Sequence, residues 1–317
     1  MSGWVCPRCG ARLRSAEGQL ICSDPRCSRA FPIVGGIPIL INEDRSVFPI
    51  ADFVSRRATT FDWSRQSARA SARGLLRTLQ RGIADLSPSL TLGVNEFTAH
   101  DAVREILKVR PGAKILVIGC GAQRFSPVGA ACFVYSDVSI GPLTQVVFDA
   151  TDIPYPDETF DAVLSVAVIP YVSDPYRCVA EITRVLCPGG FVYDTSAFMQ
   201  QVHMGRFDYT RFTYMGHRRL FRDFDAVQRG ITGGPAMALC WSISYFVESL
   251  SDSPSWRRLA RLGCRYSLFW LKYFDRLLVR RRGAYDAASG FFLFGRKREQ
   301  PLNDREILDS HVGLRPR

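Results

Sequence analysis

Lys-Ile-Leu-Val-Ile-Gly-Cys-Gly, at residues 114–121, is a short apolar run that ends in two closely spaced glycines. Such a run is typical of a buried parallel strand that enters a tight turn. Gly119 and Gly121 carry no Cβ, so the backbone at this turn can come close to a ligand. The stretch therefore predicts the first strand of a nucleotide-binding α/β sheet.

Three more segments follow in the order that such a sheet requires. They are Val-Tyr-Ser-Asp-Val-Ser at 134–139, Phe-Asp-Ala-Thr-Asp-Ile-Pro-Tyr-Pro-Asp-Glu-Thr-Phe-Asp at 148–161, and Glu-Ile-Thr-Arg-Val-Leu-Cys-Pro-Gly-Gly at 181–190. An acid about 20 residues after the glycines, here Asp137, is placed to accept hydrogen bonds from ribose hydroxyls. Asp149 and Ala150 end a third short strand, where a carboxylate can accept a hydrogen bond from an adenine amino group.

The remaining sheet elements can be placed from apolar runs and helix signals. We expect strands over Phe160–Val168, Phe191–Thr195, Asp225–Thr232 and Ser289–Lys297, the last two forming an antiparallel pair. We expect a helix over Asp174–Leu186 that stops at Pro188-Gly189-Gly190, as a C-cap does. Only eleven residues separate Asp137 from Asp149, which is too few for the usual crossover helix between parallel strands.

These segments resemble the class I S-adenosylmethionine-dependent methyltransferases, in particular the branch of the ubiquinone and menaquinone C-methyltransferases. The resemblance covers roughly residues 95–225 and implies a Rossmann-like sheet, mostly parallel with an antiparallel last strand, and S-adenosylmethionine as cofactor. It assigns the cofactor pocket to Gly119, Cys120, Gly121, Asp137, Val138, Asp149, Ala150 and Ser165. The chain departs from the family at Val117, where an acid is usual, at Gln123, where a third glycine is usual, and at Ile169-Pro170-Tyr171, where relatives often show Leu-Glu-His.

Length and composition fit one large α/β domain with a small appendage. The 317 residues are 47% apolar and 22% charged, as in a soluble globular protein. The net charge of +11 comes almost wholly from arginine and permits attraction to a polyanion such as anionic lipid or RNA. The first ten residues lack the apolar segment of a signal peptide, and the longest nearly apolar stretch, Ala236–Val247, is too short to span a bilayer. We therefore expect a cytoplasmic protein.

Four cysteines near the N-terminus predict a metal site. Cys6 and Cys9 form one knuckle, and Cys22 and Cys27 form a second one twelve residues later. This spacing can place four thiolates around one structural zinc ion, and the alternative is two disulfides or free thiols. Phe-Pro-Ile-Val-Gly-Gly-Ile-Pro-Ile-Leu-Ile at 31–41 resembles the ending of the zinc-ribbon activator proteins that partner RNA and protein methyltransferases, over residues 4–42.

The sequence divides the chain into four parts. Residues 1–42 are the zinc ribbon, 43–96 a helical connector, 97–299 the methyltransferase domain with a helical insertion at 235–288, and 300–317 a polar tail. In the connector, Ala68–Ile83 can form a helix with an apolar face, and we expect the connector to cover the mouth of the cofactor site. The fused ribbon suggests a structural or substrate-presenting role.

The acceptor site should lie beyond the fifth strand, at the carboxyl ends of the sheet. Residues 196–213 concentrate histidine, aspartate, arginine and aromatic residues without periodicity, as binding loops do. The pattern resembles a subgroup of small-molecule methyltransferases of glycan and secondary-metabolite pathways. We expect His203 to accept a proton from the acceptor and Asp208 to orient His203. We expect Tyr209 to hydrogen-bond the acceptor and Arg211 to hold an anionic group of the substrate. The alternative is that His203, Asp208 and Arg211 only tie the loop down.

The insertion is helical in pattern and admits two interpretations. From Trp256 onward, apolar residues fall on one face and arginines on the opposite face. Such a helix can be a lid packed on the domain with a solvated arginine face, or it can lie on an anionic membrane through residues 256–282.

Three functions fit the sequence. The leading hypothesis is a methyltransferase that acts on a small-molecule acceptor, including a lipid-linked one, by O-methylation. The first alternative is an RNA methyltransferase, which the ribbon and the charge support, although the chain lacks an Asn/Asp-Pro-Pro-Tyr motif. The second alternative is an inactive methyltransferase-like binding module, which the departures at Val117, Gln123 and 169–171 motivate.

Overall fold

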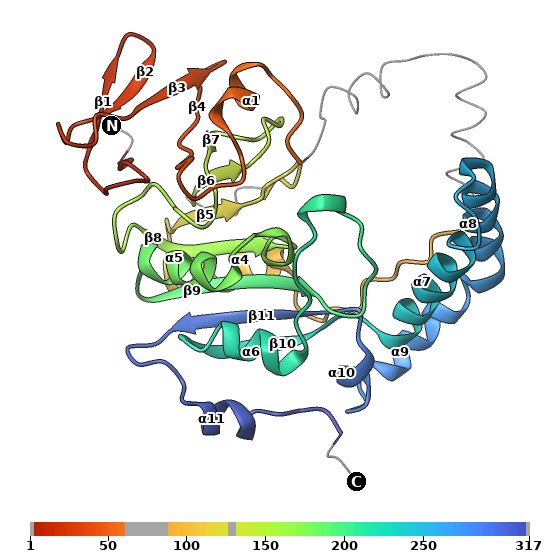
Figure 1. Cartoon of the computed structure of the whole chain (residues 1–317). Helices are drawn as coiled ribbons and strands as arrows, with labels where there is room; N and C mark the ends of the chain where they lie inside the picture. Colours follow the sequence, from red (N-terminus) through yellow and green to blue (C-terminus); the bar gives the residue numbers. More distant parts are fainter. Residues whose placement is uncertain (1–2, 61–87, 126–130, 315–317) are drawn as a thin grey trace.

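The computed structural model describes residues 3–60, 88–125 and 131–314, and a seven-stranded sheet forms its centre (Figure 1). From edge to edge the strands are β10 (Phe224–Gly233), β11 (Gly290–Lys297), β9 (Leu186–Ala197), β8 (Phe160–Val166), β5 (Lys114–Ile118), β6 (Cys132–Asp137) and β7 (Val146–Val147). β11 runs antiparallel to both of its neighbours, β10 and β9, and the other six strands run in one direction. The Rossmann-like fold with an antiparallel last strand is therefore confirmed.

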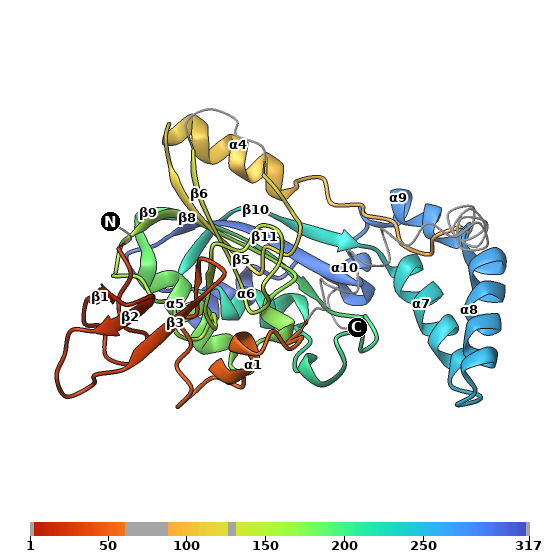
Figure 2. The ribbon, with the colours of Figure 1, turned by 90° about the horizontal axis from the view of Figure 1, so that it is seen from above.

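Helices cover both faces of the sheet, and Figure 2 shows α4 (Ala99–Val109) on one side and α5 (Pro175–Val185) with α6 (Tyr214–Leu220) on the other. Alternate residues of β5 supply the two cores. Ile115 and Val117 pack in the cluster of α4, whereas Leu116 and Ile118 pack in the cluster of α5. This arrangement explains why β5 reads as a continuous apolar run, since both of its faces are buried.

Local signals start α4 and α5, the two helices of 11 residues that cover the sheet. Thr98 caps α4 in a reciprocal pair with Asp101, and Asp174 caps α5 ahead of Pro175 at its first position. The helix predicted over Asp174–Leu186 is observed to within one residue at each end, but Pro188-Gly189-Gly190 does not form its C-cap. The helix ends at Val185, and Leu186 already pairs with Phe160, so the three residues form a bend inside β9 with φ 64° at Gly189.

The edge of the sheet formed by β6 and β7 has a short connection and a short last strand. No helix lies between β6 and β7, as the eleven-residue spacing predicted, and residues 138–145 cross directly from one strand to the next. β7 has only two residues, and Asp149 follows two positions after its end.

The N-terminal module extends the sheet at this edge. Its strands β1 (Leu13–Ala16), β2 (Gln19–Cys22), β3 (Ala30–Val34) and β4 (Ile37–Pro38) form an antiparallel sheet, followed by α1 (Ile50–Val54). Ile39 forms a parallel bridge with Val147, and the amide of Leu40 donates to the carbonyl of Val147 at 2.8 Å. The module is thus joined to the domain by backbone pairing.

The helical insertion stands beyond the carboxyl end of β10 and apart from the sheet in Figures 1 and 2. It contains α7 (Pro235–Glu248), α8 (Pro254–Leu268), η3 (Leu271–Phe274), α9 (Asp275–Leu278) and α10 (Ala284–Ala287). A short helix, α11 (Asp304–Asp309), lies within the segment predicted as a polar tail. None of the helices in the described ranges has both the length and the apolar character that crossing a bilayer requires.

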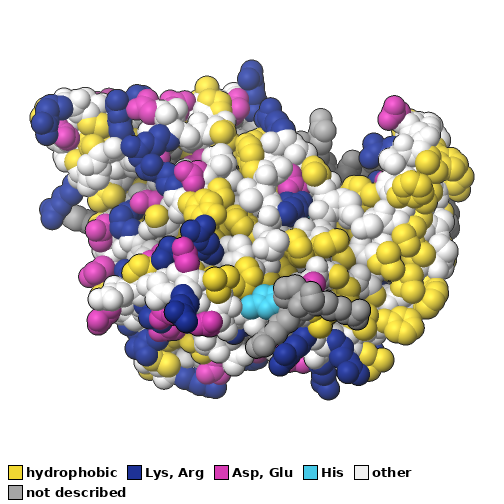
Figure 3. Space-filling view, turned by 60° about the horizontal axis from the view of Figure 1, so that its bottom comes forward, with side chains coloured by type: hydrophobic (Ala, Val, Ile, Leu, Met, Phe, Trp, Pro, Cys, Tyr) yellow, Lys and Arg dark blue, Asp and Glu magenta, His cyan; other side chains and the backbone are white. Residues whose placement is uncertain are grey.

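Most large apolar residues of α8 are exposed, which is at odds with a lid packed through its apolar face. Only Ala260 and Cys264 of α8 are buried. We call the exposed large apolar side chains between 239 and 278 the insertion surface, and Figure 3 shows a band of apolar side chains at this end of the molecule. They are Leu239, Tyr245, Phe246, Leu250, Trp256, Leu259, Leu262, Tyr266, Trp270, Tyr273, Phe274, Leu277 and Leu278.

Candidate functional site

A cavity of about 330 Å³ opens at the carboxyl ends of β5, β6, β7 and β8. This is the edge at which open α/β sheets bind their ligands. The structure brings seven of the predicted site residues into its walls. They are Gly119, Gly121, Asp137, Val138, Asp149, Ala150 and His203.

Asp137 is held in place by backbone and hydroxyl donors. One carboxylate oxygen accepts from the amide of Gly121 at 2.9 Å, and the other accepts from the amide and hydroxyl of Ser139 at 2.9 and 2.8 Å. Burial raises the pKa of Asp137, although these hydrogen bonds act to lower it. The carboxylate is thus fixed toward the cavity with lone pairs left for a ligand's hydroxyl groups.

Asp149 is fixed by donors from two parts of the chain. Its Oδ1 accepts from the amide and hydroxyl of Thr151 at 3.0 and 2.8 Å. Its Oδ2 accepts from the hydroxyl of Ser46 at 2.7 Å, and that hydroxyl in turn accepts from the amide of Phe48 at 3.1 Å. The predicted adenine-binding carboxylate is therefore positioned by the segment that follows the N-terminal ribbon.

Gly119 is required by backbone conformation and by packing. Its φ is 62°, and a Cβ there would lie 2.4 Å from the Cγ2 of Val168. Val168 also lines the cavity. The first glycine of the turn thus lets the loop after β8 close over the end of β5.

We expect Gly119→Ala to lower the free energy of unfolding by about 2–4 kcal/mol, because it adds a methyl clash to the cost of a positive φ. Gly112→Ala is the matched control, since Gly112 has φ 79° and nothing within 4 Å of its Cβ position. It should cost only about 1 kcal/mol. Urea unfolding measures both, and adding Val168→Ala should recover part of the loss at Gly119. Equal losses at the two glycines would contradict the clash.

Two predicted cofactor residues lie behind the cavity wall. Cys120 is buried in the core against α4, where burial raises its pKa to about 12. Ser165 is fully buried on β8 beside Asp194 of β9, and its hydroxyl has no partner among the described residues. Neither side chain lines the cavity, so a contact with the cofactor stays a prediction for both.

His203 reaches the cavity and meets a residue that the sequence did not assign. Its Nε2 lies 2.5 Å from the hydroxyl of Tyr171, which also lines the cavity. Its Nδ1 lies 3.3 Å from the carbonyl of Gln201. A carbonyl only accepts, so in the tautomer that satisfies this contact Nδ1 carries the proton and Nε2 is the acceptor. Burial raises the pKa of Tyr171 to about 12, which keeps its phenol protonated.

In the sequence, Tyr171 stood out only because it departs from the pattern of the resembled family. It ends the Ile-Pro-Tyr triplet that stands where relatives often show Leu-Glu-His. The triplet forms the 3-10 turn η1 (Ile169–Tyr171), which directs the phenol back toward the loop that carries His203.

Asp208 and Arg211 hold together the loop 196–213, the predicted acceptor-binding segment, which we call the acceptor loop. Arg211 pairs with both carboxylate oxygens of Asp208 and donates to the carbonyls of Gln200 and Gln201. Asp208 also accepts from the amide of His203 at 2.9 Å. Burial opposes its ionisation, but the bonds from Arg211 and from backbone amides lower its pKa. These contacts fit the alternative in which both residues tie the loop down.

Tyr209 is not brought to the cavity. Its side chain is 46% exposed, and its amide bonds to the carbonyl of Pro170 at 3.0 Å. A hydrogen bond from Tyr209 to an acceptor therefore stays a prediction without a contact in the structure.

The connector supplies cavity walls that sequence analysis did not name. Val47, Phe48 and Thr60 line the cavity. Phe48 also stacks on Phe207 of the acceptor loop, with ring centroids 5.4 Å apart. The predicted helix Ala68–Ile83 lies outside the described residues.

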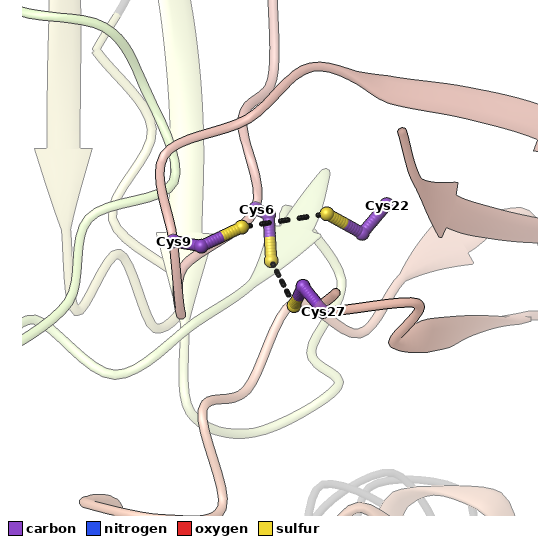
Figure 4. A group of neighbouring side chains, drawn as sticks. All are labelled: Cys6, Cys9, Cys22 and Cys27. Carbon is purple, nitrogen blue, oxygen red and sulfur yellow. Dashed lines mark hydrogen bonds between the residues drawn. The ribbon is translucent and has the colours of Figure 1, made fainter. Parts of the chain in front are cut away.

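The four N-terminal cysteines converge on one point (Figure 4). Their sulfur atoms all lie within 4.8 Å of one another, with 3.4 Å between Cys9 and Cys22 and 3.8 Å between Cys6 and Cys27. A disulfide needs about 2.05 Å between sulfurs, whereas four thiolates at about 2.3 Å from one tetrahedral zinc stand roughly 3.8 Å apart. The donor set and spacing fit a zinc ion.

Comparison with known proteins finds a family match over part of the central sheet. Residues 116–193 match the family described as methyltransferase domain. The chain is 34% identical over 105 residues to "Probable tRNA methyltransferase 9B" of Homo sapiens, covering 29% of this chain and 23% of that protein. It is 32% identical over 113 residues to "Demethylmenaquinone methyltransferase" of Mycobacterium tuberculosis, covering 32% of this chain and 47% of that protein. The chain thus spans less than half the length of these relatives.

A solved structure similar to the chain is that of the MccD protein. The TM-score is 0.40 at 15% identity, and the match covers 63% of this chain and 98% of that one.

Proposed function

We propose that the methyltransferase domain of this chain transfers a methyl group from S-adenosylmethionine to a hydroxyl oxygen of a small amphiphilic acceptor. The observation that carries the proposal is one cavity with two fixed carboxylates, Asp137 and Asp149, near the glycine turn and a histidine, His203, from the acceptor loop. The matched family supports the cofactor. The apolar side chains of Val47, Phe48 and Met204 in the same walls favour an acceptor with apolar groups.

Each carboxylate has a separate role in this proposal. Asp137 accepts hydrogen bonds from the ribose hydroxyls, and Asp149 accepts one from the adenine amino group. When bound, S-adenosylmethionine supplies an electrophilic methyl group, so that the protein contributes mainly alignment. The turn at Gly119 and Gly121 allows the backbone to approach the cofactor without a side chain in between.

His203 acts as the proton acceptor. Its Nδ1–H faces the carbonyl of Gln201, which leaves the Nε2 lone pair directed at the hydroxyl of Tyr171 in the cavity wall. The hydroxyl of an acceptor could bind at Nε2 in place of the Tyr171 phenol or beside it. That hydroxyl would give its proton to Nε2. Asp208 and Arg211 act through His203 by fixing its backbone, and are positioning residues.

Zinc has a structural role in this proposal. Cys6, Cys9, Cys22 and Cys27 would bind one ion that closes the ribbon, and none of the four lines the cavity. About 25 residues of ribbon cannot bury a core of their own, so metal binding would supply much of the module's folding energy.

We expect Asp137→Ala to weaken S-adenosylmethionine binding by about 1.5–3 kcal/mol, the scale of hydrogen bonds to a charged group. Isothermal titration calorimetry measures the loss, and Asp252→Ala, at an exposed position of the insertion, is the control. If the wild type shows no saturable binding at millimolar cofactor, the alternative of an inactive binding module is favoured over the proposal.

Cofactor affinity should also depend on pH through Asp137. The carboxylate is the form that accepts from ribose, and burial raises its pKa. Affinity should therefore be highest above that raised pKa and fall as the pH is lowered through it. Titrations over a pH series measure this, and Asp137→Asn should bind more weakly with a flat acid limb. A wild-type acid limb that persists unchanged in Asp137→Asn would assign the dependence to another group.

RNA methylation is the second candidate, because one of the matched relatives is named as a tRNA methyltransferase and the chain carries a net charge of +11. Incubation with radiolabelled S-adenosylmethionine separates the two. Label in bulk tRNA supports the second candidate, and label in the organic phase of a lipid extract supports the amphiphilic acceptor.

A further inference from the structure

Exposed large apolar residues are concentrated in the insertion. Of the 23 such residues among the described ones, thirteen belong to the insertion surface, within 40 consecutive positions. Leu259 is 64% exposed, Phe246 66% and Leu277 71%. A cluster of this kind marks an interaction site rather than the scattered apolar exposure of an ordinary surface.

The orientation of α8 is what exposes this surface. Its small residues Ala260 and Cys264 are buried, and Arg261 pairs with the buried Glu248 of α7 at 2.6 Å. These contacts hold the helix with its other side outward. Leu259, Leu262 and Tyr266 lie on that outer side and are exposed. The packing against α7 therefore leaves the large apolar side chains of an amphipathic helix uncovered.

The charge around the surface is positive. Residues 235–288 contain nine Lys and Arg against four Asp and Glu, and two of these acids, Glu248 and Asp275, are buried. The guanidinium of Arg276 lies over the ring of Tyr273, 5.3 Å from its centroid. Tryptophan and tyrosine beside exposed arginines form the composition of a helix that lies in the interface of an anionic bilayer.

The insertion also contacts the acceptor loop. The hydroxyl of Ser242 on α7 accepts from Gln201 at 2.9 Å, and the hydroxyl of Tyr245 donates to the carbonyl of Val202 at 3.4 Å. Val202, next to His203, is itself 61% exposed. The apolar surface is thus joined to the loop that carries the proton acceptor.

We propose that the insertion surface docks on an anionic lipid bilayer and brings the acceptor loop to the lipid–water interface. The two helices of 14 and 15 residues would lie in the plane of the interface without crossing it. The docking is inferred from the exposed apolar surface, its positive charge and its contacts with the acceptor loop, and it does not depend on the proposed function. That the acceptor enters from the lipid phase does rest on the proposed methyl transfer.

Vesicle flotation of the full chain, without cofactor, tests the docking. The wild type should float with phosphatidylcholine vesicles that contain about a third phosphatidylglycerol, and much less with phosphatidylcholine alone, since each exposed cation near the surface contributes about 1 kcal/mol. The triple variant Leu259→Ser, Tyr266→Ser and Trp270→Ser should lower binding by roughly tenfold or more. The double variant Arg258→Glu and Arg276→Glu should remove the preference for anionic lipid.

A matched control separates docking from general stickiness. The triple variant Val109→Ser, Tyr176→Ser and Leu308→Ser removes three apolar side chains, 61%, 61% and 68% exposed, from other parts of the surface. It should float like the wild type. A wild type that does not float, or a control that loses as much binding as the insertion variant, would overturn the proposal.

Sedimentation equilibrium tests the competing occupant, a second copy of the chain. A wild-type dimer that becomes a monomer in the insertion variant would overturn bilayer docking in favour of a subunit interface. Cofactor binding is measured separately by calorimetry without vesicles. Flotation without cofactor binding would leave the docking intact and reject the proposed function, and the reverse result would reject only the docking.

Discussion

Replacing His203 by alanine is expected to lower turnover by roughly 10²- to 10⁴-fold, the usual scale of losing a general base. The affinity for S-adenosylmethionine should change little, because the two carboxylates that would hold the cofactor, Asp137 and Asp149, are fixed by other residues. Single-turnover rates with an identified acceptor and calorimetry with the cofactor measure the two quantities.

The expected loss follows from the tautomer of His203 that satisfies its contact with Gln201. Nδ1 faces the carbonyl of Gln201, so Nε2 is the basic atom, and it faces the cavity at Tyr171. Tyr171→Phe removes the phenol but leaves the base, and we expect a smaller loss of roughly tenfold or less. Asp208→Asn should lower turnover by disturbing the position of the loop. Because it leaves the base in place, its loss should be smaller than that of His203→Ala.

Controls can separate a base from a scaffold. His100→Ala changes an exposed histidine on α4 and should leave turnover unchanged. Equal turnover in the wild type and His203→Ala, with the same acceptor, would make His203 a loop scaffold. Substrate alignment alone would then account for the rate. Arg211 would affect turnover only by holding the acceptor loop in place.

The central sheet was predictable because each of its signals is local. The apolar run at Ile115–Ile118, the glycine turn and the short crossing from Asp137 to Asp149 each constrain the chain within a few residues. The end of α5 was predicted to within one residue, but the role of Pro188-Gly189-Gly190 was not. These residues are typical of a helix C-cap, but Leu186 pairs with Phe160 of β8, so they lie inside β9 instead.

The missing parts of the site depend on contacts between distant segments. Ser46 and Phe48 carry no motif. Ser46 reaches Asp149, and Phe48 lines the cavity, because Ile39 and Leu40 pair with β7 nearby. Hydrophobic periodicity in the insertion likewise does not show contacts between distant segments. It separates the apolar and basic faces of α8 correctly. Which side of α8 packs on α7 depends on Ala260 and Cys264, whose small side chains allow α7 to approach.

The second large effect is expected from removing the metal of the N-terminal ribbon. A strong chelator, or Cys22→Ser, should release the one zinc ion per chain that metal analysis is expected to find in the purified protein. In zinc-finger peptides structural zinc supplies apparent folding energies of about 10–16 kcal/mol, so the ribbon should unfold before the sheet does. Cys132→Ser, at an exposed cysteine outside the cluster, is the control and should keep the metal.

Loss of the ribbon should also weaken cofactor binding, because the two sites are physically connected. Trp4 donates to the hydroxyl of Tyr155 at 2.8 Å, and Asn42 donates to Asp152 at 3.1 Å. A few residues further on, Ser46 donates to Asp149 at 2.7 Å. These contacts hold the segment that fixes a cofactor carboxylate, and its release should lower S-adenosylmethionine affinity by roughly tenfold or more, that is by at least about 1.4 kcal/mol.

A double-mutant comparison tests whether the effect passes through Ser46. Ser46→Ala alone should lower the affinity by roughly three- to tenfold, since it removes one hydrogen bond to Asp149. If the ribbon acts through this bond, chelation should weaken binding less in Ser46→Ala than in the wild type, because coupled changes are not additive. Circular dichroism must show that the sheet stays folded in the chelated protein. Full retention of cofactor affinity after zinc loss would show that the ribbon is an independent module, and the cavity would then need only the strands of the sheet to hold its ligand.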